Sequence, residues 1–158
     1  MLRWTVVVTT CALVIGISAS PVAAQDVPLA ERARGSERVV VGRVGSVSPA
    51  WQTNEFGDRL IVSVIRLTVS ETLKGPPQAV VDVEIEGGTI GDVTLNVSDQ
   101  TPFVPGERAV FYLRRNARSR LVPHLRGQGV LKLDRFDRVP GSSLTLEMIR
   151  REVARGAR

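Results

Sequence analysis

The segment 80–86 reads VVDVEIE and alternates strictly between apolar and polar positions. Every second residue of an extended strand lies on the same face, so Val81, Val83 and Ile85 would share an apolar face and the intervening acids a polar one. A longer segment, 60–74, has the same period, and its expected apolar face consists of Ile65, Leu67, Val69 and Leu73. This repeat favours strands over helices and predicts a mainly β chain.

Other segments extend this interpretation. Strands are expected at 38–47, 92–97, 108–115 and across 121–134, the last as one strand kinked at glycines or as two. The segment 48–59 is expected to be a loop. In 108–115 the expected inward residues are Ala109, Phe111 and Leu113.

After the first 24 residues, helical signals occur only in two places, one near residue 30 and one near the C-terminus. The lead, residues 25–37, could form a short helical turn with Pro28 at its start and Gly35 as its stop. Near the C-terminus, Thr145 is a suitable N-cap, followed by an apolar face at Leu146, Ile149 and Val153.

Short, closely spaced strands with turn signals predict a small OB-like β-barrel of five to seven strands, with a short N-terminal helical turn and a C-terminal helix. The barrel would occupy residues 38–134, and the C-terminal helix and tail residues 135–158. A barrel is preferred to a sandwich because a strand as long as 60–74 can coil and join both sides of a barrel.

Residues 1–24 have the layout of a signal peptide: Arg3, an apolar run, then small residues ending at Ala24. The run is short for a membrane span, which needs about 20 residues, although an uncleaved anchor remains an alternative. Cys11 fits an apolar position of this run better than a lipid attachment site. We therefore expect a periplasmic or secreted protein without stable membrane insertion after cleavage.

The expected exported chain, residues 25–158, contains no cysteine and its formal charge falls from +5 to +4 with the loss of Arg3. Burial of apolar side chains must hold the fold together, since disulfides are excluded. The modest charge, scattered along the chain, argues against a nucleic-acid partner. A monomer is expected.

The segment 87–91, GGTIG, is the one glycine cluster that could suggest a phosphate site. A phosphate loop would present backbone N–H groups at the start of a helix, but no helix signal follows here and no lysine stands after the last glycine. The alternative is a purely conformational role, in which Gly87, Gly88 and Gly91 provide positive φ angles between two strands. A turn is the preferred interpretation.

Several segments, in order, resemble the TIMP-like or netrin-module OB-fold, a family with secreted bacterial relatives. They are SERVVVGRVGSVSPAW, the long strand ending in ETLKG, the hairpin VDVEIEGGTIGDVTLNV and PFVPGERAVFYL, together covering about residues 36–134. In the animal inhibitors of this family, an N-terminal cysteine chelates the protease zinc and is tied by a disulfide to the loop that matches 87–91. This chain lacks both cysteines, so the resemblance does not imply metalloproteinase inhibition. It does imply that the loop could form a contact edge.

Residues that could carry enzymatic chemistry are few. His124 is the only histidine, and Ser142 and Ser143 lie in a turn without a nucleophile-elbow motif. The acidic residues Asp82, Glu84 and Glu86 could bind a divalent cation, but a solvated face opposite Arg66 or Arg114 is the simpler expectation. No cofactor is predicted.

The sequence therefore predicts an exported, non-enzymatic β-barrel that binds a protein or a cell-envelope component. The alternatives are an enzyme that uses carboxylates such as Asp82 and Glu84, and an envelope-associated structural protein. The expected contact residues are two aromatic residues in the loop 48–59 and the glycine cluster: Trp51, Phe56, Gly87, Gly88, Thr89, Ile90 and Gly91.

Overall fold

The structure is a computed structural model that describes residues 26–53, 57–100 and 102–157. The predicted signal peptide and Phe56 lie outside the described residues. In chain order the elements are α1 (Leu29–Gly35), β1 (Arg38–Thr53), β2 (Arg59–Lys74), β3 (Val80–Glu86), β4 (Gly88–Ile90), β5 (Val93–Leu95), β6 (Arg108–Arg115), β7 (Leu121–Pro123), the 3₁₀ turn η1 (Arg126–Gly129), β8 (Val130–Leu133) and α2 (Leu146–Gly156). The predicted mainly β class is confirmed.

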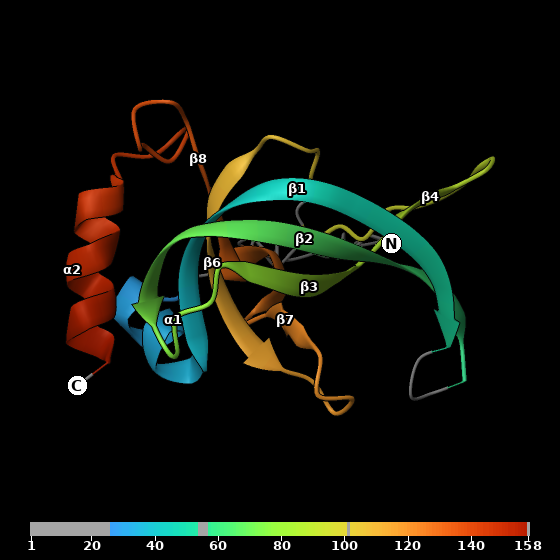
Figure 1. Cartoon of the computed structure of the whole chain (residues 1–158), viewed down its shortest axis with the longest axis horizontal. Helices are drawn as coiled ribbons and strands as arrows, with labels where there is room; N and C mark the ends of the chain where they lie inside the picture. The colour runs from blue at the N-terminus through green and yellow to red at the C-terminus, as the bar shows by residue number, and fades with distance from the viewer. Residues whose placement is uncertain (1–25, 54–56, 101, 158) are drawn as a thin grey trace, which may run out of the picture.

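Strands β1 and β2 form one long, curved antiparallel pair (Figure 1). Three register shifts interrupt the pair between Val39 and Ser46, close to Gly42 and Gly45. Such bulges bend a strand and increase its twist, which lets 16-residue strands curl over a core. The predicted loop 48–59 is wrong over its first six residues, because pairing with β2 continues β1 to Thr53 despite Pro49.

The main sheet has six strands in the order β3-β2-β1-β6-β7, with β8 also paired to β6. Among the described residues, the edge strands β3 and β7 form no backbone ladder with each other. The predicted barrel is therefore not confirmed, since the sheet is open. Closure needs edge strands of matching length and stagger. Here β7 has three residues and ends in Pro123, which has no N–H to donate.

The first hydrophobic core lies against the inner face of the curved sheet. It contains the residues predicted from alternation, including Ile65, Leu67 and Phe111, all of them buried. The predicted inward sets of 80–86 and 108–115 are thus confirmed. In 60–74 the prediction holds for Ile65 and Leu67, and Val69 is partly buried here, but Leu73 packs against the core on the opposite face of the sheet.

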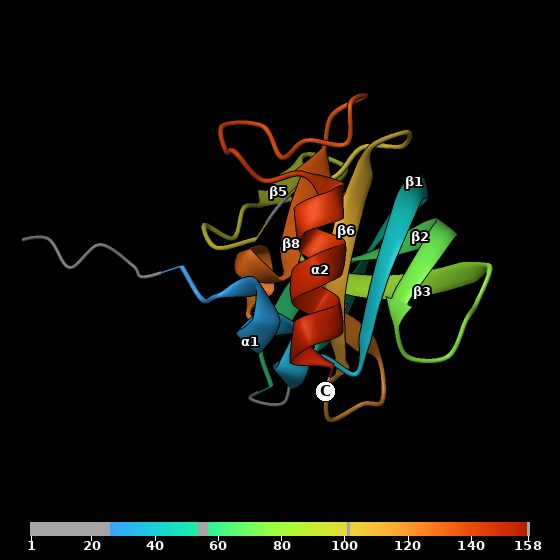
Figure 2. The same ribbon diagram turned by 90° about the vertical axis from the view of Figure 1, so that its left-hand side faces the viewer.

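A second core, which the sequence did not predict, lies on the outer face of the sheet. Val39 and Val41 of β1 and Val110 and Tyr112 of β6 pack here against α2. Figure 2 shows α2 crossing in front of β6 and β8, with α1 beside it. Strand β6 is therefore buried on both faces, as its continuous apolar run AVFYL permits.

Both predicted helices are present, and each has hydrogen bonds at one of its ends. Helix α1 follows Pro28, and Lys74 Nζ donates to the carbonyls of Ala33 at 2.7 Å and Ser36 at 2.6 Å. These bonds satisfy acceptors at the C-terminal end of the helix. Helix α2 is capped by Thr145, whose Oγ1 accepts from the Met148 N–H at 3.3 Å, as the sequence predicted.

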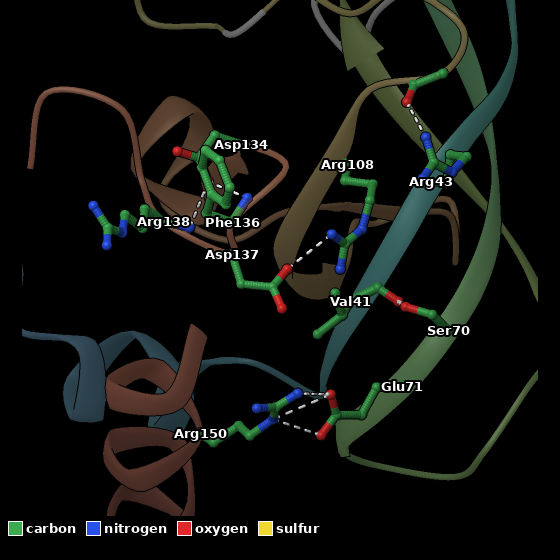
Figure 3. Close-up of polar contacts among 11 residues, drawn as sticks. Val41, Arg43, Ser70, Glu71, Arg108, Asp134, Phe136, Asp137, Arg138 and Arg150 are labelled. Carbon is green, nitrogen blue, oxygen red and sulfur yellow. Dashed lines mark hydrogen bonds and ion pairs between the residues drawn. The ribbon is translucent and has the colours of Figure 1, made fainter. Parts of the chain in front are cut away.

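Two ion pairs attach the C-terminal region to the sheet (Figure 3). Arg150 of α2 forms a forked contact with Glu71 of β2, with a shortest N–O distance of 2.8 Å. Arg108 of β6 lies 2.8 Å from Asp137, in the connection before α2. The strand expected across 121–134 is two strands, β7 and β8, separated by η1.

Candidate functional site

A small two-stranded sheet, β4–β5, stands apart from the main sheet and projects from it (Figure 1). Gly87 and Gly88 connect it to β3, with φ angles of 109° and 137°. Ser63 Oγ donates to the Gly87 carbonyl at 2.6 Å. A Cβ at Gly88 would lie 2.5 Å from the same Ser63 Oγ, so only glycine lets the chain cross β2 this closely.

The cleft beneath this hairpin, here called the hairpin cleft, has a volume of about 290 Å³. Its floor is apolar and is continuous with the first core through Val47, Ile65, Ile85 and Phe103. Polar groups on its other walls come from Ser63, Thr89, Thr94, Asn96 and Gln100. An apolar cavity with a few polar groups, at the mouth of a curved sheet, is typical of a ligand-binding site.

Three of the predicted contact residues line the hairpin cleft: Gly87, Gly88 and Thr89. Thr89 is exposed and its Oγ1 lies 2.9 Å from Thr94 Oγ1 across the hairpin. Ile90 is half-buried and does not line the cleft. The segment 87–91 was predicted to be a turn, but Gly88–Ile90 forms strand β4 and the turn itself is at Gly91 and Asp92.

Of the two predicted aromatic contacts, Phe56 lies outside the described residues, so only Trp51 can be placed. Trp51 lies on β1, is 40% exposed, and has the Arg59 guanidinium 4.8 Å from its ring centroid. It does not line the hairpin cleft. Trp51 is nevertheless close to the glycine cluster, because it pairs with Ile61, whose carbonyl accepts from the Gly87 N–H at 2.8 Å.

The acidic side chains of β3 are paired with arginines. Arg66 Nε and Nη2 donate to the two carboxylate oxygens of Asp82 at 2.9 and 3.1 Å, and this hydrogen bonding holds the pKa of Asp82 below its usual value. Glu84 lies 3.6 Å from Arg120, and Glu86 lies 3.1 Å from Arg126. The expected solvated, arginine-paired face is confirmed for Asp82 and Arg66. Within the described ranges, no three potential metal ligands are grouped.

A second cleft, of about 370 Å³, lies between β3 and the β6–β7 hairpin. Three guanidinium groups line it, those of Arg114, Arg118 and Arg126. We call it the arginine cleft; Glu84, Glu86, Gln52, Gln100 and Asn116 also line it. Its cations come mostly from the segment 114–120, RRNARSR, in which four of seven residues are arginine. The sequence analysis considered only the charge of the whole chain and so missed this cluster. The local density of arginine in 114–120 could have revealed it.

The two clefts adjoin, since Glu86 and Gln100 line both. His124 lies elsewhere, with its imidazole packed against Gly35. Partial burial, together with the nearby charges of Arg114 and Lys74, lowers the pKa of His124 and favours its neutral form. Its backbone N–H donates to the Tyr112 carbonyl at 2.7 Å.

No protein family model matches the sequence, and a comparison with curated proteins finds no match. Among the described residues, no helix has the length and apolar character required to cross a membrane. The site is therefore interpreted from its own geometry.

Proposed function

We propose that this protein is an exported, non-enzymatic binding module that holds a protein or cell-envelope component in the hairpin cleft. The observation that carries the proposal is the cleft itself: an apolar floor of core side chains, open to solvent and bordered by polar groups. A projecting two-stranded hairpin forms one wall, which would let the cleft adapt to its ligand. The N-terminal signal pattern supports export.

The module is proposed to be OB-like, with incomplete closure. Supporting this, the two edge strands β3 and β7 lie in contact, and Arg120, in the turn just before β7, lies 3.6 Å from Glu84 of β3. The resemblance to TIMP-like modules fits this arrangement, with the β4–β5 hairpin as the contact edge. The zinc-chelating cysteine of the animal inhibitors is absent from the expected exported chain, so protease inhibition forms no part of the proposal.

An enzyme based on Asp82 and Glu84 is the less favoured alternative. A general acid needs a carboxyl group whose pKa lies near the working pH. The forked hydrogen bonds from Arg66 lower the pKa of Asp82 instead, which favours a permanently ionised group. A purely structural envelope role would leave the hairpin cleft without a purpose.

Capture from the native extracellular or periplasmic fraction tests the proposal. The exported protein would be immobilised, and bound components quantified for the wild type and for T89R, which places a long cation in the mouth of the cleft. The matched control is T68R, because Thr68 is also an exposed strand threonine but does not line the cleft. We expect T89R to reduce capture of a specific component about tenfold and T68R to leave it unchanged. Equal capture by all three proteins would contradict the proposal.

A further inference from the structure

The arginines of the arginine cleft differ in how they are paired with carboxylates of the described residues. Arg126 is paired with Asp99 at 3.0 Å and with Glu86 at 3.1 Å, and Arg120 approaches Glu84. By contrast, neither Arg114 nor Arg118 forms an ion pair with any carboxylate of the described residues. Among the described residues, no ion pair therefore matches the charges of these two guanidinium groups in the cleft.

Arg118 is held across this cleft by neutral acceptors. Its Nη2 donates to the Thr53 carbonyl, and its Nη1 lies 3.5 Å from Gln52 Oε1. These contacts join the β6–β7 turn to the far end of β1 and fix the guanidinium in place. A guanidinium has five N–H donors, so an anchored arginine still offers several to a ligand. A carboxylate, with two acceptor oxygens, matches this fork.

Other groups in the cleft restrict which anion can enter. Glu84 and Glu86 line the same cleft, and the Glu84 side chain is only 14% exposed. A polymer with a charge at every repeat, such as polyphosphate, would bring anions against these carboxylates. Three amide side chains, Gln52, Gln100 and Asn116, also line the cleft. The Asn116 Oδ1 already accepts from the N–H groups of Arg118 and Arg120, and Gln52 Oε1 faces Arg118, so these two amides offer mainly their NH₂ donors to the carbonyls of a peptide. The cleft is thus suited to carboxylates spaced along a neutral, hydrogen-bonding chain.

We propose that the arginine cleft is a second binding site, and that it takes an extended peptide segment whose acidic side chains alternate with neutral ones. Arg114 and Arg118 bind the carboxylates, while the amides and glutamates of the cleft bind backbone groups. The site adjoins the hairpin cleft at Glu86 and Gln100 but does not depend on what the hairpin cleft binds. One acidic peptide segment could therefore be held beside a separate ligand.

Calorimetric titration of the exported protein tests this site with a short synthetic peptide in which aspartate and serine alternate. The reference probe is the same peptide with asparagine in place of aspartate. We expect the aspartate peptide to bind at least tenfold more tightly, with an affinity that falls as salt rises. Loss of a charged hydrogen-bond donor should weaken binding about tenfold or more in R114Q, and similarly in R118Q.

The matched control is R115Q. Arg115 is the next residue on β6, carries the same charge and pairs with Glu37 at 3.5 Å, but does not line the cleft. We expect R115Q to bind like the wild type, and all variants to keep the wild-type melting temperature within a few degrees. Equal weakening by R114Q and R115Q would show only nonspecific charge attraction and overturn the proposal. Tighter binding of polyphosphate than of the aspartate peptide would overturn it as well, as would equal affinity for the two peptides.

Discussion

Replacing Gly88 with alanine places a methyl group where the fold has no room. The new Cβ would lie 2.5 Å from Ser63 Oγ, 3.2 Å from Pro49 Cβ and 3.3 Å from Ile61 Cγ2, with the backbone at a φ of 137°. Crowding of this kind costs about 1–3 kcal/mol, and a strained φ adds about 1–2 kcal/mol. We expect G88A to lower the free energy of unfolding by about 2–5 kcal/mol.

Gly91 provides the matched control for this substitution. It also has a positive φ, 57°, but a Cβ there meets nothing within 4 Å. G91A should therefore cost only the backbone part, about 1 kcal/mol. Urea unfolding followed by the fluorescence of Trp51, the only tryptophan outside the predicted signal peptide, measures both.

The same assay can identify the atom responsible. Because Ser63 Oγ is the nearest neighbour, S63A should recover about 1 kcal/mol of the G88A loss in the double variant. Equal costs for G88A and G91A would refute the close crossing of β4 over β2, and with it the geometry of the hairpin cleft.

Three further predictions concern other parts of the molecule. K74M should lower the free energy of unfolding by about 2 kcal/mol, because the carbonyls of Ala33 and Ser36 at the end of α1 lose a charged donor. The control is K132M, which removes a partly exposed ion pair with Glu107 and should lower the free energy of unfolding by at most about 1 kcal/mol in the same urea assay. Burial raises the pKa of Tyr112, the only tyrosine, to about 12. The contribution of the neutral phenol to stability is therefore complete below about pH 10 and is lost as the pH rises towards about 12. Y112F should abolish this pH-dependent loss of stability, and the phenolate absorbance of the wild type should titrate near the raised pKa. N-terminal sequencing of the exported protein should begin at Gln25 or close to it, while an intact Met1 in the membrane fraction would indicate an anchor.

The sequence predicted strand faces well because a period of two determines which side chains share a surface. Leu67 and Val83 are buried as their alternation requires. The same rule was insufficient for β6. It identified Phe111 as an inward residue but did not indicate that Tyr112, on the opposite face of the strand, is buried as well. The continuous apolar run of β6 instead indicates a strand covered on both faces, and helix α2 supplies the second cover.

Features that depend on tertiary pairing could not be predicted locally. Pro49 and the polar residues around Trp51 favour a loop, but pairing with β2 keeps this segment extended. Closure of the sheet depends on whether β3 and β7 align, and no periodicity in either strand encodes that alignment. The sequence did suggest Arg114 opposite the acids of β3, and the local arginine density was visible, but the cleft that Arg114 and Glu84 both line is formed by segments distant in sequence.

Amide hydrogen exchange with and without the captured component would test the central claim most directly, namely that the hairpin cleft binds a ligand. We predict slower exchange confined to segments that line the cleft, chiefly 85–89 and 94–97, and little change in α2. Protection that appears only on α2, or no protection at residues 85–97 despite saturated binding, would contradict the account.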